Sequence, residues 1–270
     1  MDEFPVKVGA MLYTLVDPNR GHEVAYNRWY ERDHFYGGVM VGPGTLAGGR
    51  WVARRAEKDL RFPTGVDAEV AVADPLDAGS YLATYFISAD HVAEHFAWAN
   101  AEVFKLYEAG RGFEERTHAH TALYLFRRAH HRDADGVPVE LALDHRFAGL
   151  VSLHVDRAEA VSADDLDDWL AGPGRERWAG DDSPVAIVAT WRPIIPKGEE
   201  GKSPMKLGSG PGTPARSMLL AFCDAAPADH WDRFRALGDA IDTSGLATVR
   251  LAAPFIPTVV GTDTYADQLW

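Results

Sequence analysis

Three side chains with acid–base chemistry recur at helical spacing near the N-terminus. Tyr26, Tyr30 and His34 are four residues apart, so on a helix the two phenols and the imidazole line one side. An imidazole can take a proton from a carbon next to a carbonyl group, and a tyrosine hydroxyl can donate to the enolate oxygen that forms. We therefore predict a catalytic row. The structural alternative is that Tyr26 and Trp29 pack on a sheet, and His34 lies at the helix C-terminus, where the dipole favours a cation.

A second set of candidates alternates along residues 117–128. His118, His120, Tyr124 and Phe126 share one face of a strand with a period of two, and apolar residues occupy the other face. If helices cover the apolar face, this set looks into the interior, where polar atoms on an apolar wall suit a small molecule. We expect His120 to be catalytic and the other three to contact substrate. A solvated strand end is the alternative.

Other polar residues are weaker candidates. Arg50 could hold a carboxylate or enolate through its planar guanidinium, or it could pair with a surface acid. His154 becomes a further candidate if its strand face also lines the interior. His91 and His95 have the spacing of metal ligands on a helix, but no third ligand accompanies them, so a solvated or partner-facing surface is favoured and no metal site is predicted.

The apolar periodicity predicts the same order of elements twice: strand, helix, strand, strand, helix, strand. In the first half the expected strands are 6–16, 46–54, 81–88 and 117–128, and the helices are 23–36 and 90–109. In the second half the expected strands are 148–156, 185–191, 217–223 and 247–255, and the helices are 163–170 and 229–241.

This order indicates an α+β fold of two tandem ferredoxin-like βαββαβ repeats, 1–135 and 136–270. The first repeat carries the candidate site, and the second is expected to be structural. Both repeats have a long insertion between their second and third strands, 56–80 and 196–214, which supports a duplication and indicates lids or arms. The Gly-, Pro- and Ser-rich segment 197–214 is expected to be disordered.

The first predicted helix also carries a recognisable pattern. The run from Tyr26 to His34 reads YNRWYERDH, and Pro43-Gly44 and Arg50-Trp51 follow it. This pattern resembles the EthD-like branch of the dimeric α+β barrel superfamily. The resemblance implies that the two repeats pair their sheets into a barrel within one chain, and that His34, Tyr30, Tyr26 and Trp29 lie at the site. The second repeat has lost the histidine, so one site per chain is expected.

Composition excludes several classes of partner. The formal net charge is -13 with no basic stripe, so neither nucleic acid nor an anionic membrane is an expected partner. No stretch approaches the ~20 apolar residues of a membrane span, and the N-terminus does not read as a signal peptide, so we expect a cytoplasmic protein. The lone Cys223 cannot form an intramolecular disulfide, and we expect it to be buried and inert.

These observations and the resemblance together predict a cofactor-independent enzyme. Its ligand is expected to be a small hydrophobic carbonyl compound, aromatic or polyketide-like, and His/Tyr acid–base chemistry would form an enolate. Cyclases, isomerases, lyases and cofactor-free monooxygenases share that first step, and the sequence does not choose among them. Two alternatives stay open: a non-catalytic small-ligand-binding or stress-type protein, and a haem-binding barrel enzyme. Whether the chain pairs into a homodimer is also open.

Overall fold

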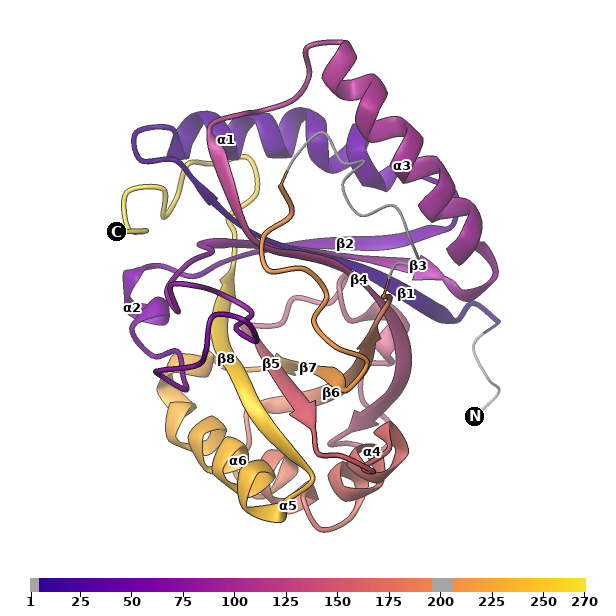
Figure 1. Ribbon diagram of the computed structural model, residues 1–270, viewed down its shortest axis with the longest axis vertical. Coiled ribbons are helices and arrows are strands. Elements are labelled where there is room, and N and C mark those ends of the chain that lie inside the picture. The colour runs from indigo at the N-terminus through magenta and orange to yellow at the C-terminus, as the bar shows by residue number, and fades with distance from the viewer. Residues whose placement is uncertain (1–4, 196–205) are drawn as a thin grey trace.

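Two four-stranded antiparallel sheets, one from each half of the chain, join edge to edge in a closed barrel (Figure 1). The structure is a computed structural model that describes residues 5–195 and 206–270. Around the barrel the strand order is β1-β3-β2-β8-β5-β7-β6-β4. The order β4-β1-β3-β2 of the first half therefore recurs in the second half as β8-β5-β7-β6, which confirms the predicted tandem ferredoxin-like architecture.

The elements have the following bounds. The first half contains β1 (Val8–Pro18), α1 (Glu23–Trp29), β2 (Thr45–Val52), α2 (Arg55–Lys58), β3 (Tyr81–Ser88), α3 (Val92–Glu108) and β4 (Arg116–His131). The second half contains β5 (Gly149–Arg157), α4 (Ala163–Ala171), α5 (Arg175–Ala179), β6 (Val185–Pro193), β7 (Arg216–Cys223), α6 (Trp231–Ser244) and β8 (Ala247–Pro257).

The first helix departs from its prediction. Gly37 and Gly38 do not end it: two π-helical turns, Tyr30–His34 and Tyr36–Met40, continue α1. A Cβ on Gly38 would lie 2.8 Å from the ring of His34, so the glycine makes room for that imidazole. The glycines were predicted to end the helix, but Gly38 instead allows the backbone to lie close to the ring of His34.

Helices cover the outside of the barrel on two opposite sides. In Figure 1, α1 and α3 lie above the first-half strands, and α4, α5 and α6 lie below the second-half strands. Aromatic and aliphatic side chains fill each sheet–helix layer. No helix of the described residues has the length and apolarity to cross a bilayer.

Side chains from both sheets fill the barrel interior. Its largest fully buried members are Tyr13, Met11, Phe86, Tyr124, Trp191, Phe222 and Phe255. The connection 56–80 closes the end at which β4 begins, with Val72 and Ala73 in the core. The inter-half linker closes the end at which β4 finishes, with Val139 and Phe147. Part of the insertion 56–80 therefore belongs to the packed interior, whereas 67–69 and 74–75 are exposed.

The second insertion is described only in part. Residues 197–205 of the segment expected to be disordered lie outside the described residues. Residues 206–214 are described, and Thr121 N donates to Leu207 O at 2.9 Å, so this stretch pairs with β4.

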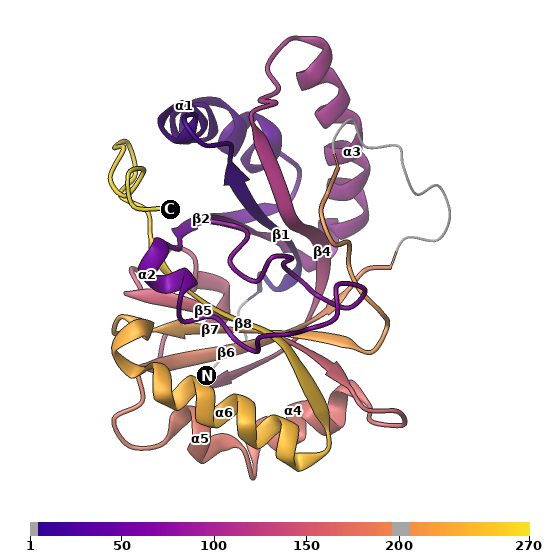
Figure 2. The same cartoon turned by 60° about the vertical axis from the view of Figure 1, so that its left-hand side comes forward.

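The C-terminal segment ties the two halves together outside the barrel. It leaves β8 and runs beside α1, which both views show (Figures 1 and 2). Asn27 Nδ2 donates to Thr262 O at 2.7 Å, and Trp270 Nε1 donates to Glu23 Oε1 at 2.7 Å. The last residues of the second repeat therefore contact the first helix of the first.

Candidate functional site

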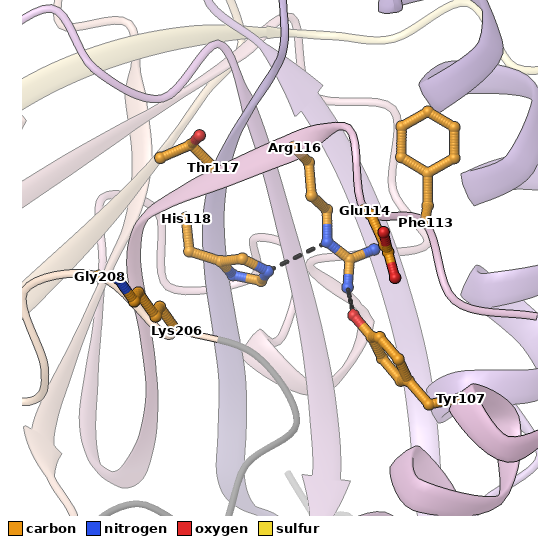
Figure 3. Close-up of a pocket in the computed structure, with 8 residues that line it drawn as sticks. All are labelled: Tyr107, Phe113, Glu114, Arg116, Thr117, His118, Lys206 and Gly208. Atoms are coloured by element: carbon orange, nitrogen blue, oxygen red, sulfur yellow. Dashed lines mark hydrogen bonds between the residues drawn. The ribbon is translucent and has the colours of Figure 1, made fainter.

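A cavity of about 510 Å³ opens where β4 begins (Figure 3). Its walls come from the last turn of α3, from the chain that leads into β4, from the first residues of β4 and from the connection before β7. They combine charged, hydrogen-bonding and aromatic side chains: Tyr107, Phe113, Glu114, Arg116, Thr117, His118, Lys206 and Gly208. Six of these residues belong to the first repeat and two, Lys206 and Gly208, belong to the second.

His118 is held in one orientation on this wall. Arg116 Nε donates to His118 Nε2 at 3.2 Å, and Arg116 Nη2 donates to the Tyr107 hydroxyl at 3.2 Å (Figure 3). Because Nε2 accepts, the ring proton is on Nδ1, which donates to Thr121 Oγ1 at 2.7 Å. The imidazole therefore presents an unprotonated nitrogen beside a guanidinium and a phenol.

The environment keeps this imidazole neutral. Burial, followed by the charge of the adjacent Arg116, lowers the pKa of His118 from 6.5 to about 3. Desolvation and a like charge both disfavour the imidazolium. His118 is consequently neutral near pH 7.

The position of His118 corrects its prediction. The strand alternation places it in the interior with His120, but the register between β1 and β4 shifts between these two residues. His120 lies opposite Leu15, which faces the interior, whereas His118 lies opposite Val16, which faces the helices. The bulge inserts one extra residue, so His118 points to the helix-covered face.

Tyr26, Tyr30 and His34 do lie in one row, but in the layer between sheet and helix. The ring centroids of Tyr26 and Tyr30 are 5.6 Å apart, and those of Tyr30 and His34 are 5.2 Å apart. The Tyr30 hydroxyl shares a hydrogen bond of 2.9 Å with the Tyr85 hydroxyl, and burial raises the pKa of both phenols. The row is part of an aromatic core and does not line the described cavities.

Trp29 connects this row to the cavity. Its ring stacks on His34 with 4.4 Å between centroids, and the guanidinium of Arg116 lies 4.5 Å above the Trp29 ring. Burial, followed by the charge of Arg116, lowers the pKa of His34 to about 3. Trp29 and His34 thus form the layer behind Arg116, where a cation–π contact helps to fix the guanidinium.

Arg50 is buried and does not line the cavities, although its partners Asn27 and Glu31 line a small one of about 180 Å³. Its Nη1 donates to Asn27 Oδ1 at 2.8 Å and to Glu31 Oε1 at 2.9 Å, and the guanidinium lies 4.5 Å from the Tyr30 ring and 5.2 Å from the Tyr81 ring. These contacts agree with the alternative expectation, in which Arg50 pairs with an acid. The pair is buried, however, and not at the surface. The structure gives no support to a substrate contact.

His120, Tyr124 and Phe126 face the interior, as the alternation predicts. The Tyr124 hydroxyl lies 2.7 Å from His120 Nε2, and the Ser209 hydroxyl lies 2.8 Å from His120 Nδ1. Phe126 packs on Trp191 with 5.2 Å between centroids. His120 and Tyr124 are fully buried, so this acid–base pair is present but closed off from solvent. Their catalytic and binding roles stay predictions.

A second series of hydrogen bonds in the barrel interior joins the two repeats. Tyr13 donates to Ser152 Oγ at 3.1 Å, and Ser152 Oγ is 3.0 Å from His154 Nε2. His154 therefore faces the interior, which was the condition for its candidacy. Tyr13 was not identified from the sequence, because an isolated tyrosine in an apolar strand reads as core. The signal that could have found it is its alternation with Met11 and Leu15.

A further cavity of about 590 Å³ lies next to the first, at the end of the barrel. Thr117, His118 and Gly208 line both cavities. The second cavity is also lined by Ala119 and Ser209, which lie directly outside His120. The start of β4 therefore has open space on both sides.

The described residues offer little for a metal or a haem. No three His, Cys, Asp or Glu side chains among them gather at one point. His95 is buried with Nδ1 3.0 Å from Pro43 O, which corrects the prediction of a solvated surface. A haem needs an imidazole nitrogen that faces space for a flat macrocycle. His120 is enclosed, and both ring nitrogens of His118 are engaged, so these residues do not fit a haem as arranged.

Comparison by sequence identifies no relative: no family model and no curated protein matches the chain. Solved structures do match over nearly the whole length. An anthrone oxidase-like protein is 11% identical, with a TM-score of 0.54, and the match covers 96% of this chain and 98% of that one. A putative chlorite dismutase is 10% identical, with a TM-score of 0.51 and coverage of 98% and 100%. A putative monooxygenase from Fusobacterium nucleatum is 10% identical, with a TM-score of 0.50 and coverage of 95% and 94%.

At these identities the likeness concerns fold, and a shared fold does not determine a reaction. The EthD-like branch within the superfamily stays a prediction from the first-helix pattern. The strand order and the matched structures agree on the architecture: the chain has the fold of the dimeric α+β barrel proteins, with both repeats in one polypeptide.

Proposed function

We propose that the cavity at the start of β4 is the active site of a cofactor-independent enzyme that acts on a small aromatic or polyketide-like carbonyl compound. One observation carries the proposal. A neutral imidazole, His118, lies on the cavity wall 3.2 Å from the guanidinium of Arg116, and the hydroxyl of Tyr107 contacts that guanidinium from the other side. A base next to two donors is what enolate formation requires.

In the proposed step, His118 Nε2 takes a proton from the carbon next to the substrate carbonyl. Arg116 turns its Nε–H from His118 to the substrate oxygen, which frees the Nε2 lone pair and stabilises the enolate charge. A base with a pKa of about 3 is weak in the resting protein. The forming enolate offsets the charge of Arg116, the smaller of the two causes of the low pKa, and so raises the pKa of His118 as the proton moves.

The walls suggest the chemical class of the ligand. Phe113 and Tyr107 supply ring surfaces that suit a flat aromatic group. Arg116 and Lys206 supply positive charge for an oxyanion or a carboxylate, and Glu114 is the acidic residue among the described residues of the wall. In this proposal Trp29, Tyr26, Tyr30 and His34 are positioning residues, since they build the aromatic layer behind Arg116.

A binding protein without turnover is the second candidate, and one observation favours it. Both ring nitrogens of His118 are engaged in hydrogen bonds, so the resting site offers no free base. Such a protein would hold the same class of ligand in the same cavity. The two candidates differ in whether Arg116 releases His118 when the ligand binds.

The test is proton exchange, because it detects enolate formation whatever reaction follows. Benzoylacetone, an aromatic 1,3-diketone, is incubated with the protein in deuterium oxide at mildly acidic pH, and loss of the signal between its carbonyl groups is followed by NMR. We expect wild type to accelerate exchange, and His118→Ala to lower the protein-dependent rate by about 100-fold, the usual scale of a general base. The exposed His91, replaced by Ala, is the matched control and should behave like wild type.

The other outcomes separate the candidates. Saturable binding of benzoylacetone that is lost in Arg116→Gln, without accelerated exchange, would support the binding protein. Accelerated exchange that survives in His118→Ala would show that another residue is the base. Absence of both binding and exchange would remove this cavity as the site for that class of ligand.

A further inference from the structure

Residues 207–209, called the strap below, form a short added strand on β4. Thr121 N donates to Leu207 O at 2.9 Å, and Ser209 N donates to Ala119 O at 3.0 Å. The strap occupies the edge of β4 that β6 takes over farther along, from Tyr124 onward. Leu207 is half-buried, and Gly208 and Ser209 are exposed, so little apolar surface holds the strap in place.

Ser209 is exposed, yet its hydroxyl reaches a fully buried histidine. It donates to Val72 O at 2.7 Å, so its oxygen accepts from His120 Nδ1 at 2.8 Å. The other nitrogen of His120 accordingly accepts from the Tyr124 hydroxyl at 2.7 Å. One serine thus fixes the tautomer of His120 and joins the strap to the connection 56–80.

Behind the strap lies a packed aromatic cluster with an unused hydrogen-bonding atom. The ring of His120 lies edge-on to Tyr13, at 5.6 Å, and to His154, at 5.5 Å. Within the described part of the chain, His154 Nδ1 is buried without a hydrogen-bond partner. Burial lowers the pKa of both histidines, and the charge of Arg216, which is paired with Asp156, adds to this effect. A buried polar atom without a partner is costly, so it calls for an explanation.

In front of the strap lies the cavity of about 590 Å³, which Ala119, Gly208 and Ser209 line. The strap is therefore the layer between this open space and His120. Its displacement would extend the cavity inward and leave His120 Nδ1–H without its acceptor.

We propose that the strap is displaceable and that His120 forms a second ligand site, for a small phenol or enol whose hydroxyl takes the place of the Ser209 hydroxyl. The hydroxyl oxygen would accept from His120 Nδ1, and the ring would pack against the ring edges of Tyr13 and Tyr124. The two cavities share Thr117, His118 and Gly208, but this site does not depend on the proposed chemistry at His118.

Gly208 provides a precise way to open the strap. It has a φ of +80°, and a Cβ there would lie 2.3 Å from Ala119 O, so alanine cannot occupy this place while the strap stays paired. Gly210 has a φ of +68° with nothing near its Cβ position. Gly210→Ala is therefore the matched control, with similar backbone strain and no collision with β4.

The first measurement is native-state amide exchange by NMR. The Thr121 amide bonds the strap, whereas the next amide, Ala122, points to the opposite edge, where it lies opposite Tyr13 of β1. We expect Thr121 to exchange faster than Ala122 in wild type. Ser209→Ala, which removes two side-chain hydrogen bonds, should speed Thr121 about tenfold or more and leave Ala122 unchanged. Gly208→Ala should have at least the same effect, and Gly210→Ala little.

The second measurement is binding of p-nitrophenol, followed by titration calorimetry and by the imidazole ¹⁵N signals. We expect about tenfold tighter binding in Ser209→Ala than in wild type or Gly210→Ala, with shifts at His120, and loss of binding when His120→Phe is added. Ser209→Ala keeps the test available if Gly208→Ala does not fold. Equal exchange at Thr121 in wild type and both strap variants, binding insensitive to the strap, or shifts at His118 in place of His120 would each overturn the proposal.

Discussion

Buried neutral histidines characterise the first repeat. Burial lowers the pKa of His34, His118 and His120 to about 3, in each case assisted by a nearby arginine. Each imidazole is neutral in the folded protein at a pH where the unfolded chain would take up a proton. The folded state therefore loses stability as the pH falls below 6.5, and the loss continues down to the folded pKa.

His120 allows a direct measurement of this effect, because it is fully buried. Between pH 6.5 and about 5, above the range of ordinary carboxyl groups, each such histidine should lower the free energy of unfolding by about 1.4 kcal/mol per pH unit. His120→Gln should reduce the slope of stability against pH by that amount, although it also lowers the stability at neutral pH. Urea unfolding over this pH range provides the slope.

The exposed His91, replaced by Gln, should leave the slope unchanged. An identical slope in wild type and His120→Gln would mean that His120 takes up a proton in the folded state and that its surroundings are more polar than described.

For single residues, the sequence predicts which side chains lie in this region better than it predicts the direction in which each one points. The alternation correctly places His120, Tyr124 and Phe126 in the interior, because strand geometry alone fixes which residues share a face. It misplaces His118, since a β-bulge depends on the pairing with β1 and leaves no local pattern.

Among the elements, a buried ion pair joins β2 to the π-helical turn that continues α1. The side chains of Arg50 and Glu31 are 4% and 9% exposed, and Glu31 also accepts from Gly261 N at 2.7 Å, which brings in the segment after β8. Three elements distant in sequence therefore meet at one carboxylate. Removal of one partner of such a pair leaves the other charge buried without compensation.

We predict that Arg50→Met lowers the free energy of unfolding by about 3–5 kcal/mol, and that adding Glu31→Gln restores part of the loss because it removes the uncompensated charge. The exposed pair Arg128–Asp168, with side chains 44% and 74% exposed, is the matched control, and Arg128→Met should cost less than about 1 kcal/mol. Urea unfolding of the two single variants and the double variant gives the free energies of unfolding for a double-mutant cycle. Equal losses at the two arginines would show that the Arg50 pair is effectively solvated.

The element order follows from the sequence, because strands and helices leave different apolar periods in it. The π-helical turns after α1 do not. Tyr30 and His34 fit an ordinary helix by spacing, and Gly38 reads as a stop although it makes room for an imidazole. The π-helical turns depend on how this segment packs on a sheet that is distant in sequence, and a single sequence does not show that packing.

The whole molecule depends on a core that both repeats share. The sheets meet where β4 pairs with β6, over Tyr124–His131, and where β2 pairs with β8, over Trp51 and Val52. The barrel follows from the tandem repeats and the resemblance, but its filled interior does not. The side chains that close its ends come from the connection 56–80 and the inter-half linker, whose loop-like composition gives no sign of burial.

Trp191 tests whether the repeats are one cooperative unit. It belongs to β6 of the second repeat and is fully buried, yet its ring packs on Phe86 of β3 at 5.3 Å and on Phe126 of β4 at 5.2 Å. Trp191→Ala should lower the free energy of unfolding by about 3–5 kcal/mol through the cavity that it leaves. Because the interior is shared, protected amides in β1–β3 and in β5–β7 should exchange faster by the same factor, about 100-fold or more. Urea unfolding should keep a single transition. Faster exchange confined to the second repeat, or two separate transitions, would show that the repeats unfold independently despite the closed barrel.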